Sequence, residues 1–97
     1  MAIDSRLLMD LMNAVRVKSQ KASEEMEDLS EACRADLKIA GVYASEGFSD
    51  PLEKQALKLY CKANYGYDQD SEKFRAAYAA LKDSMALSGD YGKEKNV

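Results

Sequence analysis

The chain of 97 residues contains no histidine and no tryptophan, only one proline and two cysteines. Without histidine it lacks the side chain that most often serves as a general base or metal ligand near neutral pH. It also has no glycine-rich phosphate loop and no serine in a nucleophile elbow. Bundles that hold two metal ions use Glu-x-x-His pairs, and none occurs here. We therefore expect a protein that is not an enzyme and that binds no metal or cofactor.

Long hydrophobic runs are missing as well. No segment approaches the roughly 20 apolar residues that a membrane-spanning helix needs, and the N-terminus has no signal-peptide pattern. The two cysteines, Cys33 and Cys61, lie far apart and form no metal-binding motif. Both fall on or beside apolar stripes, so we expect free, buried thiols in an intracellular protein with no membrane partner.

What the chain does contain is typical of a folded helical domain. Hydrophobic residues make up 46% and charged residues 32% of the sequence, and this length suits one domain. We expect residues 1–91 to form that domain and the polar residues 92–97 to form a flexible tail. The net charge of −3 does not favour a protein that grips DNA phosphates, because such proteins usually carry a basic face.

The strongest structural signal begins at Asp50. Asp50 suits a helix N-cap and Pro51 the first helical position, while Glu53 completes a capping box. A helix over 51–65 is expected, ended by Gly66. Its predicted apolar stripe comprises Leu52, Ala56, Leu59, Tyr60 and Ala63.

Three further helices are predicted at 4–15, 23–40 and 71–87, because apolar residues recur at helical spacing in each. Asp4 or Ser5 is the expected cap of the first, Ser23 of the second, and Asp70 or Ser71 of the last. The stripe of the second helix is Met26, Leu29, Cys33, Leu37 and Ala40, and that of the last is Phe74, Ala77, Tyr78, Leu81 and Met85. Four helices with short connections predict an all-α bundle.

The connections carry aromatic residues. In the predicted loop 42–49, Tyr43 and Phe48 are apolar anchors that would fold the loop back onto the bundle. After the third helix, Tyr65 and Tyr67 either cap the core or anchor a subunit interface, since tyrosine is common in both settings.

Five segments of the chain form a recognisable pattern: Asp50-Pro51-Leu52, Lys54-Gln55-Ala56, the run Leu59-Tyr60-Cys61-Lys62-Ala63-Asn64-Tyr65-Gly66-Tyr67-Asp68, the upstream run Ala35-Asp36-Leu37-Lys38-Ile39-Ala40-Gly41-Val42, and Leu87-Ser88-Gly89-Asp90-Tyr91. Together they resemble the head–tail connector proteins of long-tailed phages and prophages, which are also described as adaptor or DNA-packaging proteins. The resemblance covers most of residues 15–91.

This resemblance implies a structural protein of virion assembly. A homo-oligomeric ring would bind the portal protein, extend the DNA channel and receive the next neck or tail-completion protein after packaging. Packaged DNA would pass through without sequence-specific binding. The protein would occur at the head–tail junction of the virion and in the host cytoplasm during assembly. The candidate portal or subunit contacts are Tyr43, Phe48, Tyr65, Tyr67, Leu87, Asp90 and Tyr91.

Two other observations leave alternatives open. Arg16, Lys18 and Lys21 form a basic cluster that is either a solvated connector or a contact patch for an acidic partner or DNA. The central helix also carries Lys54, Gln55, Lys58, Lys62 and Asn64, residue types that read DNA in a recognition helix. A small helical DNA-binding or protein-binding regulatory module is therefore the alternative function.

Overall fold

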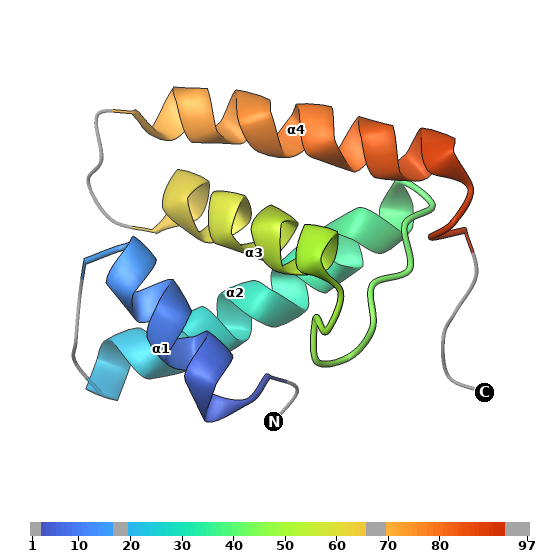
Figure 1. Ribbon diagram of the computed structural model, residues 1–97. Coiled ribbons are helices and arrows are strands. Elements are labelled where there is room, and N and C mark those ends of the chain that lie inside the picture. The colour runs from blue at the N-terminus through green and yellow to red at the C-terminus, as the bar shows by residue number, and fades with distance from the viewer. Residues whose placement is uncertain (1–2, 17–19, 66–69, 93–97) are drawn as a thin grey trace.

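The computed structural model describes residues 3–16, 20–65 and 70–92, and these ranges contain four helices and no strand (Figure 1). The helices are α1 (Ser5–Ala14), α2 (Gln20–Ile39), α3 (Pro51–Asn64) and α4 (Ser71–Ser88). In Figure 1, α3 and α4 lie side by side and run in opposite directions. Helix α2 crosses behind α3, and α1 packs near the N-terminal half of α2. The predicted all-α bundle of four helices is confirmed.

Local chemistry sets the start of α3 as the sequence predicts. The Asp50 carboxylate accepts hydrogen bonds from the backbone N–H of Leu52 at 3.0 Å and of Glu53 at 3.4 Å. Glu53 accepts one from the backbone N–H of Asp50 at 3.4 Å, which completes the capping box. Asp4 caps α1 in the same way, accepting from the Leu7 N–H at 2.8 Å. Asp70, by contrast, makes no side-chain cap bond to α4.

Two glycines end helices at positive φ, where other residues are strained. Gly89 has φ of 80° directly after α4, and Gly41 has φ of 87° shortly after α2. The predicted last residues of these helices, 40 and 87, lie within two residues of these glycines.

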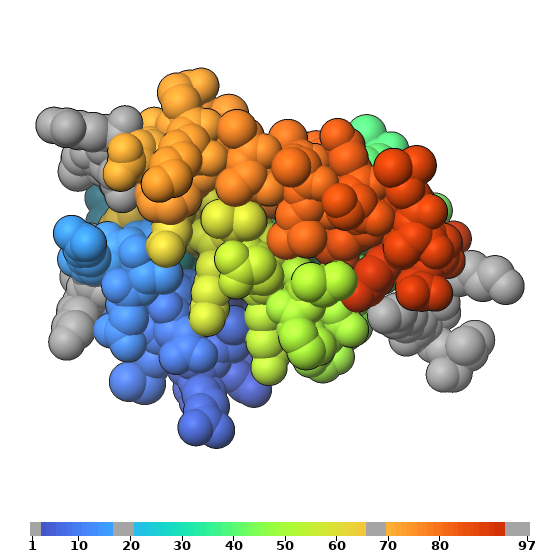
Figure 2. Space-filling model, turned by 45° about the horizontal axis from the view of Figure 1, so that its top comes forward, coloured from blue at the N-terminus to red at the C-terminus, as the bar shows by residue number. Residues whose placement is uncertain are grey.

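The core lies between the helices and joins α2 to α3. From α2 it receives Met26, Cys33 and Leu37, and from α3 it receives Ala56, Leu57 and Cys61, all fully buried. Burying one large aliphatic side chain contributes roughly 1.5–3 kcal/mol. Because these two stripes enter the same core, the outer faces of α2 and α3 point away from each other. In Figure 2, α1, α3 and α4 form the visible face and α2 is almost wholly hidden behind them.

The buried face of α3 differs from the predicted stripe. Leu52 is 46% exposed, whereas Leu57, which the predicted stripe omits, is fully buried. The helix is turned so that Glu53 points inward and Leu57 and Cys61 follow it at intervals of four residues. An inward glutamate is tolerable here because the capping box and a serine satisfy its carboxylate.

Smaller differences concern the ends and edges of the helices. Helix α2 begins at Gln20 rather than Ser23, and Ala22 in this extra turn is fully buried, so the turn belongs to the core. Ala40 and Ala77, both placed in predicted stripes, are exposed. Helix α3 ends at Asn64, while the predicted terminator Gly66 and the predicted tail from residue 93 onward lie outside the described residues. No helix in the described ranges is long and apolar enough to cross a membrane.

Candidate functional site

The loop 42–49 is held against the bundle by buried residues and one arginine. Val42 and Ala44 are buried, and the Arg34 side chain donates a hydrogen bond to the Ala44 carbonyl at 3.1 Å. Phe48 is fully buried and adopts φ of 52°, a left-handed conformation that is uncommon for a bulky residue. Phe48 is thus the loop anchor that the sequence predicts. Its ring fills the core of its own subunit and therefore offers no exposed surface to a partner.

A buried carboxylate joins this loop to α3. Ser45 donates a hydrogen bond of 2.6 Å to Glu53, which is fully buried. The Ser45 hydroxyl also accepts from the backbone N–H of Ser49 at 3.0 Å. The loop and the first turn of α3 are consequently one hydrogen-bonded unit.

The end of the described chain closes over the same unit through Tyr91. The Tyr91 carbonyl accepts from the Tyr43 backbone N–H at 2.7 Å, and the Tyr91 hydroxyl donates to the Asp50 carboxylate at 2.7 Å. The hydrogen bond to Asp50 raises the pKa of Tyr91 to about 12, because ionisation would place two negative charges in contact. We call these two bonds the Tyr91 clasp.

The surface around the clasp is apolar in part. Leu87 in the last turn of α4 and Ile39 at the end of α2 are each 87% exposed. Tyr43 is half-buried, and Asp90 is exposed. The ends of α2 and α4 meet at the same end of the bundle (Figure 1). We define the clasp end as Ile39, the loop 42–49, the first turn of α3 and residues 87–91. It offers three large exposed aliphatic side chains to a partner: Ile39, Leu52 and Leu87.

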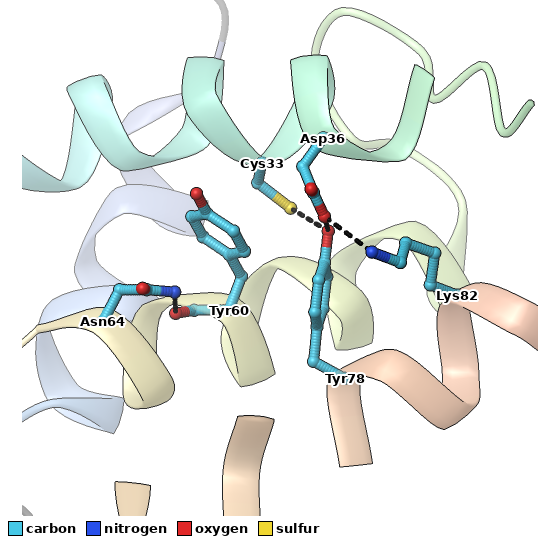
Figure 3. Close-up of polar contacts among 6 residues, drawn as sticks. All are labelled: Cys33, Asp36, Tyr60, Asn64, Tyr78 and Lys82. Carbon is cyan, nitrogen blue, oxygen red and sulfur yellow. Dashed lines mark hydrogen bonds and ion pairs between the residues drawn. The ribbon is translucent and has the colours of Figure 1, made fainter. Parts of the chain in front are cut away.

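A second polar tie lies in the middle of the bundle and joins α2 to α4 (Figure 3). The Tyr78 hydroxyl donates to Asp36 at 2.6 Å, and the Lys82 ammonium lies 3.0 Å from the same carboxylate oxygen. The Cys33 thiol donates a weak contact of 3.9 Å to the Tyr78 hydroxyl. The Tyr60 ring packs edge-on against Tyr78, with centroids 5.1 Å apart. We call this group the Asp36 tie.

Burial and hydrogen bonding act in opposite directions on the Asp36 tie. Burial raises the pKa of Asp36, but the bonds from Tyr78 and Lys82 outweigh it, so the pKa lies below its usual value. Burial, with the bond to Asp36, raises the pKa of Tyr78. The carboxylate therefore stays ionised and the phenol stays neutral across the physiological range.

The two thiols are free and buried, as the sequence predicts. Burial raises the pKa of both Cys33 and Cys61 to about 12, with the other thiol's negative charge a further cause for Cys61. Since the thiolate is the reactive form, both thiols are poor nucleophiles here.

The remaining predicted contacts lie away from the clasp end or outside the described residues. Tyr65 follows α3, is half-buried, and donates its backbone N–H to the Cys61 carbonyl at 2.8 Å. Arg16 and Lys21 are exposed at the neighbouring ends of α1 and α2. Tyr67 and Lys18 lie outside the described ranges. The structure thus brings together Tyr43, Phe48, Leu87, Asp90 and Tyr91, but not Tyr65.

Sequence reasoning missed Asp36, Lys82 and the Ser45–Glu53 bond. One signal was available for the first pair: Tyr78 and Lys82 are four residues apart and therefore share a helix face, and Asp36 flanks the apolar stripe of α2. No comparable pattern marks Ser45.

Within the described ranges, no three histidine, cysteine or acidic side chains gather closely enough to hold a metal ion. Comparison of the chain with protein-family models, with curated proteins and with solved structures found no match.

Proposed function

We propose that this chain is a head–tail connector, or adaptor, of a tailed phage or prophage. In this role, identical subunits form a ring beneath the portal, extend the DNA channel and join the head to the tail after DNA packaging. A face that binds a different face of the next copy generates a ring when the rotation closes. A ring also binds the portal through many weak contacts at once, so the affinity of each contact can be modest.

The observation that carries this proposal is the way the segments of the resemblance meet. Tyr91, from the segment 87–91, bonds to Asp50, which opens the central segment. Asp36, from the upstream segment, bonds to Tyr78 and so holds α4 in place. The Tyr91–Asp50 bond therefore joins two segments of the connector pattern, and the Asp36–Tyr78 bond joins a third segment to a residue outside the pattern. Such contacts are expected if the pattern specifies a fold.

The clasp end is the portal-facing surface in this proposal. Leu87 is highly exposed for a leucine, and Ile39 is equally exposed at the same end of the bundle. Covering aliphatic side chains of this kind with a partner stabilises the complex, because apolar surface is removed from water. Tyr91 and Asp50 contribute by fixing the position of the chain beside them.

Particle size and shape test the proposal directly. Light scattering over a concentration series, followed by electron microscopy of the same sample, should show rings with a central hole, either alone or after addition of the portal protein from the same virus. Leu87→Asp should abolish portal binding, whereas Met9→Asp, which changes an exposed apolar residue of α1, should leave it intact. A chain that stays monomeric and ignores its own portal would overturn the connector role.

One observation keeps the regulatory DNA-binding module as a second candidate. Lys54 and Gln55 are exposed on α3, and Lys58 is half-buried beside them. Binding to duplex DNA over a salt series decides this point, because a module that contacts phosphates loses affinity steeply as salt rises. The connector proposal predicts no measurable binding to duplex DNA even at low salt.

A further inference from the structure

Charge is segregated between two helices although it is mixed along the chain as a whole. The only acidic residue of α3 is Glu53, which is fully buried, so every exposed charge on this helix is positive. In α2, no basic residue occurs between Lys21 and Arg34, while this stretch holds five acidic ones: Glu24, Glu25, Glu27, Asp28 and Glu31. Each helix therefore presents one sign of charge over several turns.

The basic face of α3 is a stripe of three lysines, Lys54, Lys58 and Lys62, at intervals of four residues. These intervals place them along one side of the helix over about 12 Å, at about 1.5 Å per residue. Lys54 is exposed, and Lys58 and Lys62 are half-buried. Lys62 also lies over the Phe74 ring, with its ammonium 5.0 Å from the centroid. Lys54 and Lys58 have no ion pair or hydrogen bond with another described residue, so their ammonium groups are available.

The acidic face of α2 has nearly the same length. Glu24, Asp28 and Glu31 are all exposed and lie on the side of α2 opposite Met26 and Cys33. They extend over about 10 Å of the helix. Within the described chain their carboxylates also have no ion-pair or hydrogen-bond partner.

The two faces cannot neutralise each other within one molecule. The inner stripes of α2 and α3 enter the same core, so the outer stripes point in opposite directions. The view in Figure 2 agrees, since α3 lies on the visible face and α2 is hidden behind it. Two different patches that are complementary and cannot meet within one subunit allow a head-to-tail contact between identical copies.

We propose that the acidic face of α2 (Glu24, Asp28, Glu31) binds the basic face of α3 (Lys54, Lys58, Lys62) of a second copy of this chain. This inference rests on the proposed connector function and names the contact that would build its ring. A second copy fits better than DNA, because the chain as a whole is negative and carries its own complement of matching length. Charges arranged in this way steer association and fix the register of the two helices.

A charge-swap experiment with the full chain tests the contact. One variant carries Lys54→Glu and Lys58→Glu, and the other carries Glu24→Lys and Asp28→Lys. Self-association of the wild type is measured at low salt by sedimentation and by NMR up to millimolar concentration, with the shifted amides mapped onto the helices. Each variant alone should associate at least about tenfold more weakly, because like charges then face each other.

The decisive measurement is the self-association of an equal mixture of the two variants. In an alternating assembly every α2 face again meets an α3 face of opposite sign, so association should return, with shifts confined to these two faces. The matched control carries Arg6→Glu and Lys73→Glu, at exposed positions of α1 and α4. It makes the same change in net charge as Lys54→Glu with Lys58→Glu, and it should associate like the wild type. Raising the salt to about 1 M, where the Debye length is about 3 Å, should weaken the wild-type contact.

Three other outcomes would contradict the proposed α2–α3 contact between copies. Each of them can be told apart from a failure of the proposed connector function. If rings form but neither variant weakens them, the α2–α3 contact is wrong and the connector role stands. If the wild type shows no concentration-dependent shifts on these faces, the contact is again wrong, and the portal-binding assay alone decides the connector role. If Lys54→Glu with Lys58→Glu instead abolishes binding to duplex DNA, the basic face belongs to a DNA-binding module.

Discussion

The Tyr91 clasp and the Asp36 tie are two versions of the same contact. In each, a tyrosine hydroxyl donates to an aspartate carboxylate far away in the sequence, at 2.7 Å for Tyr91 and 2.6 Å for Tyr78. They differ in what else stabilises the carboxylate. Asp36 lies beside the Lys82 ammonium, whereas Asp50 accepts two backbone N–H groups at the start of α3.

This difference shows two ways to stabilise an aspartate side chain inside a small helical domain. A lysine supplies a full opposite charge, but Lys82 and Asp36 remain partly exposed, at 23% and 36% of their side chains, so water screens the pair. A helix N-terminus supplies fixed N–H groups and a partial positive charge that cost no side-chain entropy. The clasp should therefore depend strongly on its aspartate, and the tie should distribute its stability over several groups.

The largest expected effect comes from Asp50→Ala. This change removes the N-cap of α3 and the acceptor of Tyr91 together, so the free energy of unfolding should fall by about 2–3 kcal/mol. Urea denaturation measures the loss. Asp50→Asn keeps an oxygen at the N-cap and serves as the matched control, with a loss of about half that size. Equal losses for the two variants would show that the cap contributes nothing.

Tyr78→Phe should have the next largest effect. The variant keeps the ring contact with Tyr60 but loses a hydrogen bond to a charged group, and we expect a loss of about 1.5–2 kcal/mol in unfolding free energy. Tyr65→Phe is the matched control, because no hydrogen bond of the Tyr65 hydroxyl is found within the described chain; it should change stability by less than about 0.5 kcal/mol. Similar losses in both variants would contradict a special role for the Asp36 tie.

Tyr91→Phe should cost about 1 kcal/mol at neutral pH, the typical net value of one hydrogen bond. Its clearer signature is the dependence on alkaline pH. The folded pKa of Tyr91 is about 12, above the ordinary value of about 10, so its contribution is complete below pH 10 and is lost as pH rises toward 12. Stability curves of the variant and the wild type, measured by denaturation, should therefore converge over this interval. Parallel curves would show that the clasp does not form.

Lys82→Gln should have the smallest effect, below about 1 kcal/mol, because the ion pair is partly exposed. The informative measurement is a pair of double-mutant cycles. Lys82→Gln and Tyr78→Phe share Asp36 and should be non-additive, whereas Lys82→Gln and Tyr91→Phe should add within about 0.5 kcal/mol. Coupling of Lys82 to Tyr91 would mean that the two contacts are not independent.

Local chemistry explains what the sequence could predict. The start of α3 depends on Asp50, Pro51 and Glu53 alone, and Gly89 ends α4 because its own backbone permits positive φ. Helix existence and order followed from apolar spacing in the same way. These features need no knowledge of how the helices pack.

Packing explains what could not be predicted. The inward turn of Glu53 depends on Ser45 in the preceding loop, so a stripe chosen by apolar residues alone favoured Leu52 and omitted Leu57. The Asp36 tie joins residues 42 positions apart, and its formation depends on how α4 lies across α2. At the candidate site, the sequence predicted both Tyr43 and Phe48 as loop anchors and as candidate contacts. Nothing local reveals that Phe48 is fully buried while Tyr43 stays half-buried.

The Tyr91 clasp also determines how the last turn of α4 and the first turn of α3 can unfold locally. Helix termini ordinarily fray one residue at a time, and their amide protons then exchange with solvent independently. Here the chain after α4 is fastened to the first turn of α3, 41 residues away in sequence. Amide protons in the last turn of α4 and the first turn of α3 should therefore exchange through a single shared opening, and deuterium uptake at the two sites should rise together.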